Sequence, residues 1–226
     1  MKTRLLGLPF FLAAFAVPYC AGAADAVVVN GCPIRPAALC SGINLQDAQI
    51  AGANLARADF SRANLSGARL QGVDLTGGSL DDVNLRQADL SGSRLDRADL
   101  TRADMTQAQL RKASLISATL VSANLEGADL SDAVLRGAEL NRAQLTGAVM
   151  AGARLQRADL SGAVLRNVDL RGADLRGAVF RDAELRGAIL TGAIVNDADF
   201  SGARTRGCRG CPSQKRRSPG RNGGTH

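Results

Sequence analysis

The sequence predicts an all-β fold, a four-sided β-helix (solenoid) of about eight coils. An apolar residue recurs at every fifth position from Leu45 to Phe200, and a second column, mostly alanine, lies two positions before it. Neither an α-helix nor a flat strand buries these columns. Each residue of an α-helix advances by about 100°, so residues five apart point in different directions around its axis. In a strand, an odd period sends alternate side chains to opposite faces. A chain that turns by a right angle every five residues buries both columns, and four such sides close one coil.

The repeat runs through 32 consecutive pentads without a slip. Stacked at the strand spacing of about 4.8 Å, these pentads predict a rod on the order of 40 Å long. Asn or Asp often precedes the core position and can bond turn backbone, whereas Gly after it tolerates a positive φ at the corner. Arg57 and Arg62 hold the same slot, so Gly is not required there. In the alanine column, we expect weaker packing at Gly78 and Ser93.

One motif recurs along the chain, as in Ala58-Asp59-Phe60, Ala63-Asn64-Leu65 and Ala173-Asp174-Leu175. This A(D/N)LXX pattern resembles the pentapeptide repeat family, and the resemblance covers nearly all of the predicted mature chain. The resemblance implies the right-handed quadrilateral β-helix of that family. It implies the handedness as well, which the five-residue period alone does not determine.

The first residues have the pattern of an export signal. Lys2 and Arg4 precede an apolar run over 5–17, and Ala21-Gly22-Ala23 fits a cleavage site. The run is too short to span a bilayer as a stable helix. We therefore expect a periplasmic or secreted protein without a transmembrane segment. The predicted parts are a signal peptide (1–23), an N-terminal cap with Cys32 and Cys40 (24–42), the β-helix (43–205) and a basic, disordered tail (206–226).

The formal net charge of +7 is unevenly distributed. Residues 43–205 hold 19 Lys and Arg against 20 Asp and Glu, whereas residues 206–226 hold six basic residues and no acidic one. The rod is therefore nearly neutral. Once the signal is removed, Phe60, Phe180 and Phe200 are the only aromatic residues. These are too few for base stacking, so we do not expect nucleic acid as a partner.

The sequence offers no set of catalytic groups. The single histidine, His226, lies in the Gly-rich tail, where no ordered Ser-His-Asp or Cys-His site can form. Paired carboxylates such as Asp81 and Asp82 occupy outward repeat positions, where a solvated surface is the expected role. No phosphate-binding loop or dinucleotide fingerprint is present. We therefore expect no enzyme, no cofactor and no metal.

Four cysteines remain after the predicted cleavage, two on each side of the rod. Their separation along a rod on the order of 40 Å long excludes a single four-cysteine zinc site. In an oxidising compartment we expect two local disulfides, Cys32–Cys40 and Cys208–Cys211, that fasten the segments covering the coil ends. The alternative at Cys208 and Cys211 is a redox dithiol, although the strand-turn-helix setting of such pairs is not evident.

Outward arginines become more frequent toward the C-terminal end, with carboxylates between them. Two interpretations remain: a surface neutralised by weak ion pairs, or a site for phosphate or an anionic glycan. Nearby, apolar residues replace the usual polar residue before the core position. We therefore expect the C-terminal coils to bind a partner or to form a homodimer. The candidate residues are Arg166, Arg171, Arg176, Arg181, Arg186, Val179, Ile189 and Ile194.

Together, these features predict an exported, non-catalytic structural or interaction module. Its rod would present side chains to a protein or an anionic polymer in the bacterial cell envelope. The alternative comes from the family resemblance, because some members mimic duplex DNA and bind DNA gyrase. That role requires a strongly acidic rod in the cytoplasm, and this rod is nearly neutral and carries an export signal.

Overall fold

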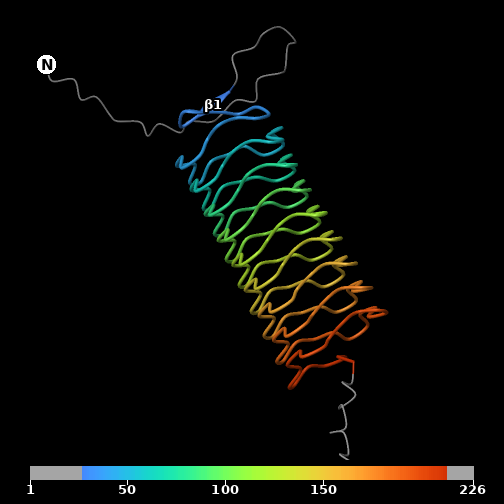
Figure 1. Ribbon diagram of the computed structural model, residues 1–226. Coiled ribbons are helices and arrows are strands. Elements are labelled where there is room, and N and C mark those ends of the chain that lie inside the picture. Colours follow the sequence, from blue (N-terminus) through green and yellow to red (C-terminus); the bar gives the residue numbers. More distant parts are fainter. Residues whose placement is uncertain (1–26, 213–226) are drawn as a thin grey trace, which may run out of the picture.

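The computed structural model describes residues 27–212. This part begins with a small antiparallel hairpin of β1 (Val28–Val29) and β2 (Cys32–Pro33). A straight rod of stacked coils follows, and no helix occurs between residues 27 and 212 (Figure 1). The predicted signal peptide and most of the predicted basic tail lie outside the described residues.

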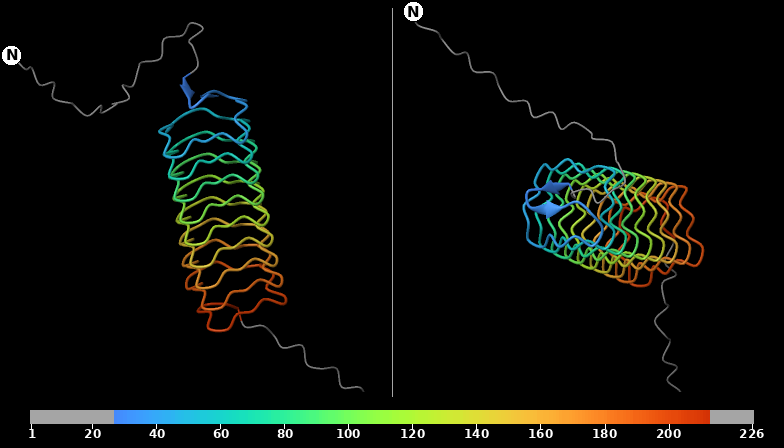
Figure 2. Two further views of the ribbon diagram at one scale, coloured as in Figure 1. Left: turned by 90° about the vertical axis from the view of Figure 1, so that its left-hand side faces the viewer. Right: turned by 90° about the horizontal axis from the view of Figure 1, so that it is seen from above.

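The coils repeat every 20 residues. Isolated parallel bridges pair the residue before each core position with the residue 20 farther along, from Leu39 with Asp59 to Ile189 with Arg209. Four pentads therefore make one coil, and the coils stack as four-sided layers (Figure 2). The four-sided β-helix predicted from the repeat is confirmed. The regular pairing also extends beyond both predicted bounds of the β-helix, residues 43 and 205.

A tight turn forms each corner. The N–H of the column alanine donates to the carbonyl of the preceding core residue, as in Ala58 N to Leu55 O at 3.0 Å. The third residue of this turn has a positive φ whether it is Gly67 (66°) or Arg57 (61°). A type II turn requires this conformation at its third residue. The corner therefore favours glycine but accepts arginine, as the sequence indicated.

Stacking of the coils satisfies the remaining backbone groups. The N–H of core residue Leu65 donates to Asn84 O in the next coil at 2.7 Å, and the N–H of corner residue Gly67 donates to Arg86 O at 2.9 Å. Where Asn or Asp precedes the core residue, the N–H of the first corner residue instead donates to that side chain, as in Ser66 N to Asn64 Oδ1 at 3.2 Å. This bond accounts for the frequent Asn and Asp before the core position, because only a short side-chain acceptor reaches that N–H.

The interior of the rod is filled by the two inward columns. Core residues from Leu80 to Leu185 are at most 1% exposed, and the alanines between them are equally buried. At the C-terminal end, Phe180 and Phe200 stack with ring centroids 4.8 Å apart and an interplanar angle of 3°. That separation matches the strand spacing of about 4.8 Å, so aromatic residues on one side stack in step with the coils.

Of the two positions expected to pack weakly, Gly78 does not. A Cβ added there would lie 3.1 Å from Leu75 O and 3.2 Å from Ala58 O, so these carbonyls already pack closely and would have to shift by a few tenths of an ångström to admit it. The prediction is wrong at this position because the neighbouring carbonyls approach the glycine closely. Ser93 is 1% exposed, and its Oγ has no hydrogen-bond partner.

Candidate functional site

The five candidate arginines near the C-terminal end form a collar, because they occupy the first corner position of five successive pentads. Residues five apart lie on adjacent corners and residues 20 apart lie in neighbouring coils. Arg166, Arg171, Arg176 and Arg181 therefore encircle the rod, and Arg186 lies one coil beyond Arg166.

Every arginine of this collar has a carboxylate partner. The nitrogen–oxygen distances are 2.7 Å for Arg166–Glu184, 2.6 Å for Arg171–Asp169, 2.6 Å for Arg176–Asp174, 2.5 Å for Arg181–Asp199 and 2.9 Å for Arg186–Glu184. The hydrogen bond from Arg176 lowers the pKa of Asp174 to about 2. Hydrogen bonds from Ser201 and Arg181 lower the pKa of Asp199 to about 2. These ion pairs leave the collar with little uncompensated charge.

The apolar residues predicted near this end do not form one patch. Val179, Ile189 and Ile194 bridge to Asp159, Asp169 and Asp174, respectively, and so belong to three different sides of the rod. Only Ile194 is strongly exposed, at 45%. Residues five or ten positions apart lie on different sides of the rod, and only residues separated by a multiple of 20 positions share a side. These residues are therefore close in the sequence but do not gather on one face of the rod.

The structure contains both predicted disulfides, Cys32–Cys40 and Cys208–Cys211, with Cα–Cα distances of 5.4 and 5.8 Å. Cys40 is buried one pentad before Leu45 and extends the core column, which ties the N-terminal hairpin to the first coil. Cys208 follows Ala203 in the alanine column at the other end. Each disulfide therefore fastens an end of the rod through an inward-facing position.

A groove that the five-residue repeat does not indicate lies on one corner of the rod. It has a volume of about 570 Å³ and is lined by Ile116, Ser117, Arg136, Gly137, Arg154, Gln156, Arg157 and Arg176. These residues come from four successive coils, at spacings close to multiples of 20. Aligning the sequence with the 20-residue coil period, instead of the five-residue repeat, would have shown that these arginines lie near one another.

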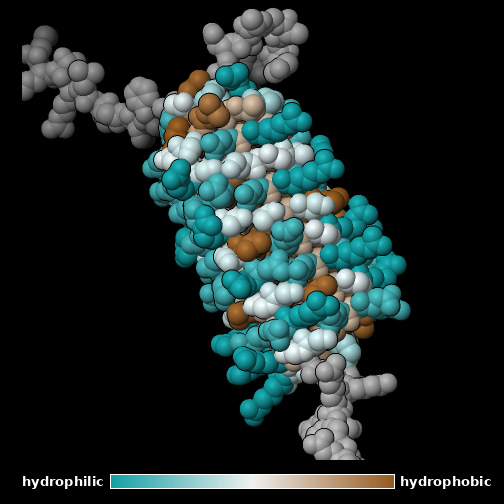
Figure 3. Space-filling model, viewed as in Figure 1, coloured by the Kyte–Doolittle hydropathy of each residue, from teal (hydrophilic) through white to brown (hydrophobic). Residues whose placement is uncertain are grey.

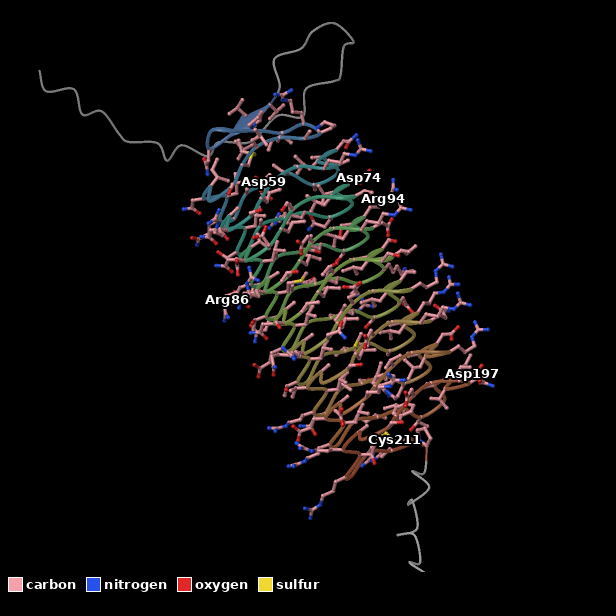
Figure 4. All side chains as sticks on the ribbon, in the orientation of Figure 1. Asp59, Asp74, Arg86, Arg94, Asp197 and Cys211 are labelled. Carbon is pink, nitrogen blue, oxygen red and sulfur yellow. A yellow bond between two sulfur atoms is a disulfide. The ribbon has the colours of Figure 1, made fainter. Side chains whose placement is uncertain are left out.

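Figure 4 labels three residues on the edge that carries this groove. Arg94 lies in the same lengthwise file as Arg154, and Asp197 lies in the same file as Arg157, because each pair is separated by a multiple of 20 residues. Asp74 and Arg94 pair across neighbouring coils at 3.3 Å. The groove therefore lies between the positions marked by Arg94 and Asp197 in that view.

The rest of the surface offers few concentrated features. On the visible face in Figure 3, hydrophobic side chains form separate spots among hydrophilic ones, with a larger group at the N-terminal end. Val27, Val28 and Leu39, near that end, are 69%, 60% and 84% exposed. Between residues 27 and 212, no cluster of three metal-ligating side chains occurs. That part of the chain also has no helix with the length and hydrophobicity to cross a membrane.

The comparisons with known proteins agree with this geometry. The family model for pentapeptide repeats matches in eight copies, over residues 38–77, 79–115, 113–152, 143–182 and 169–207. The crystal structure of HetL from the cyanobacterium Nostoc sp. strain PCC 7120 is 30% identical, with a TM-score of 0.59, and the match covers 76% of this chain and 87% of HetL. HetL is described as a pentapeptide repeat protein involved in the regulation of heterocyst differentiation.

Two further solved structures match less closely. A pentapeptide repeat protein from the Arabidopsis thaliana thylakoid lumen is 35% identical over 42% of this chain and 66% of its own, with a TM-score of 0.40. The plasmid-mediated fluoroquinolone resistance protein QnrB1 is 20% identical over 77% of this chain and 90% of its own, with a TM-score of 0.43. A search of curated proteins returns no match. The family model and the match to HetL establish that the chain belongs to the pentapeptide repeat family.

Proposed function

We propose that the protein is an exported, non-catalytic interaction module whose rod binds a protein or polymer partner in the cell envelope. The observation that carries this proposal is the pair of disulfides, one at each end of the rod. Disulfides persist in oxidising compartments and are rare in the reducing cytosol. The export signal predicted over residues 1–23 leads to the same compartment.

The architecture suits binding. Inward positions are used for packing, and coil-to-coil hydrogen bonds occupy most of the backbone groups of the walls. What remains for function is the outward side chains, held in straight files at the strand spacing of about 4.8 Å. Such files present a rigid, regularly spaced surface at little further entropic cost on binding. Members of this family are generally non-catalytic, and the role described for HetL in regulation is compatible with a binding module.

Cell fractionation with mass spectrometry of the mature N-terminus tests this proposal. We expect the chain in the envelope or extracellular fraction, starting near Ala24, with all four remaining cysteines protected from thiol alkylation. A variant that lacks residues 1–23 is the matched control and should stay in the cytosol with reactive thiols. A full-length cytosolic protein that retains residues 1–23 would refute export.

The intact mature rod should then capture a partner from the envelope fraction. A rod whose Cys32 and Cys40 are both replaced by alanine separates the side faces from the N-terminal cap. Capture by both forms would place the contact on the side faces. Capture of nothing above background by the intact rod would contradict the proposal.

A further inference from the structure

The groove on the corner of the rod carries uncompensated positive charge. Arg136, Arg154 and Arg157 line it, and none of them forms an ion pair with a carboxylate of residues 27–212. All three side chains are exposed. This sets them apart from the C-terminal collar, where every arginine is paired.

A carboxylate beside the groove is already engaged by two of the lining residues. Asp174 accepts hydrogen bonds from Arg176 at 2.6 Å and from Gln156 at 2.6 Å. Asp159, on the next side of the rod, accepts from the N–H and the hydroxyl of Ser161. Neither carboxylate forms an ion pair with the three free guanidinium groups within the described chain. The groove therefore keeps its positive charge in the folded protein.

Small residues create the hollow. In the file of corner residues that contains Arg157, the two preceding coils contribute Gly137 and Ser117. A Cβ at Gly137 would meet only the Ser117 Oγ, at 3.7 Å, so nothing large fills this stretch of the surface. The arginines reach the hollow from different files: Arg136 from the first corner position, Arg157 from the second, and Arg154 from the flat side.

This arrangement matches a phosphate chain better than a carboxylate. A guanidinium group binds one carboxylate in a single plane through two parallel hydrogen bonds. A tetrahedral phosphate can accept hydrogen bonds from donors that approach from several directions. The lining residues extend over four successive coils, about 14 Å along the axis at the usual strand spacing. A ligand with several linked phosphates can extend over this distance, whereas a single phosphate ion cannot.

We propose that this groove binds the phosphate groups of an oligophosphate or of a phosphate-containing polymer, with Arg136, Arg154 and Arg157 as the binding residues. The inference rests on the proposed function in that the groove would be one of the surfaces through which the interaction module binds its partner. The site itself is a property of the folded rod, so binding to purified protein tests it independently of where the protein resides.

The test is titration of the purified mature protein with sodium tripolyphosphate. Binding is monitored by calorimetry and by changes in amide chemical shifts. The variants are Arg136→Gln, Arg154→Gln, Arg157→Gln and the triple substitution. Each replacement has a precedent in its own repeat slot, because Gln71, Gln109 and Gln107 occupy equivalent positions. The matched control is Arg142→Gln, because Arg142 holds the same slot as Arg157 on the next corner, has the same φ of 59° and is also unpaired in the described chain.

We expect saturable binding that weakens as salt is added. Changes in amide chemical shift should be confined to the residues that line the groove. Each single substitution should weaken binding by about three- to tenfold, as the loss of one exposed charge-assisted contact does. The triple variant should lose binding, and Arg142→Gln should bind like the wild type. Absence of saturable binding by the wild type would overturn the proposal, as would equal weakening by Arg142→Gln and Arg157→Gln.

A second arm identifies the source of the phosphate. Linear polyphosphate of several tens of units is titrated in parallel with tripolyphosphate, and inorganic phosphate serves as the reference with a single phosphate group. Equal affinity per site for the two would assign the groove to a small oligophosphate, and a strong preference for the long chain would assign it to a polymer. Equal affinity for inorganic phosphate and tripolyphosphate would contradict a site for linked phosphates. The fractionation result decides export separately, so failure of one proposal leaves the other measurable.

Discussion

Ser93 provides the most direct test of the packing described above. It replaces alanine in the second inward column, is 1% exposed, and has an Oγ without a hydrogen-bond partner. A buried hydroxyl loses its hydrogen bonds to water on folding, and here no protein group replaces them. We therefore expect Ser93→Ala to stabilise the rod.

The magnitude follows from the structure. An unsatisfied buried polar group costs about 1–3 kcal/mol. The substitution retains the Cβ that fills the column and removes a single oxygen atom, so the loss of packing is small. A net gain of about 1–2 kcal/mol remains. In a domain of this size, that corresponds to a rise in Tm of about 2–8 °C.

The assay is thermal and urea unfolding of the mature protein, followed by circular dichroism. Ser61→Ala is the matched control, because the Ser61 Oγ lies 3.0 Å from the Ser79 Oγ and is hydrogen-bonded. Its removal should cost about 0.5–1.5 kcal/mol. If Ser93→Ala melts at or below the wild-type temperature, the assignment of an unsatisfied hydroxyl in the alanine column is wrong.

Three further predictions follow. Leu125→Ala removes a 0% exposed core side chain from the middle of the rod and should cost about 2–5 kcal/mol in urea unfolding, whereas Leu39→Ala, at 84% exposed, should change little. Similar losses at both positions would contradict the inward column. The folded pKa of Asp174, about 2, lies below its ordinary value of 3.8, so its stabilising effect should be present above pH 4 and be lost as the pH falls toward 2. Asp174→Asn should flatten the fall of Tm over this range, and an unchanged slope would exclude a contribution from this ion pair. Replacing Cys32 and Cys40 together with alanine should cost about 2–3 kcal/mol for the short loop that the disulfide closes, and an unchanged Tm would show that the cap does not limit unfolding.

The sequence alone predicted the fold because a strict five-residue period has few physical solutions. Leu45 through Phe200 had to face one interior, and only a chain that turns at every pentad places them there. The turn slot after each core residue was also visible, since Gly alternates there with Arg, Asn and Asp. Both disulfides followed from the positions of the cysteines on either side of the repeat.

Side-chain partners across coils were decided only by the tertiary structure. Ion pairs such as Arg166–Glu184 and Arg102–Asp82 join residues 18 and 20 positions apart, and the five-residue period does not show which arginines find a carboxylate in the next coil. In the collar, three pairs join residues two positions apart, but Arg166 and Arg181 find their carboxylates only in the next coil. The unpaired Arg136, Arg154 and Arg157 likewise meet in one groove only because the coils stack. A local repeat determines how the chain turns, but the charge on each face depends on which residues the stacking of coils brings together.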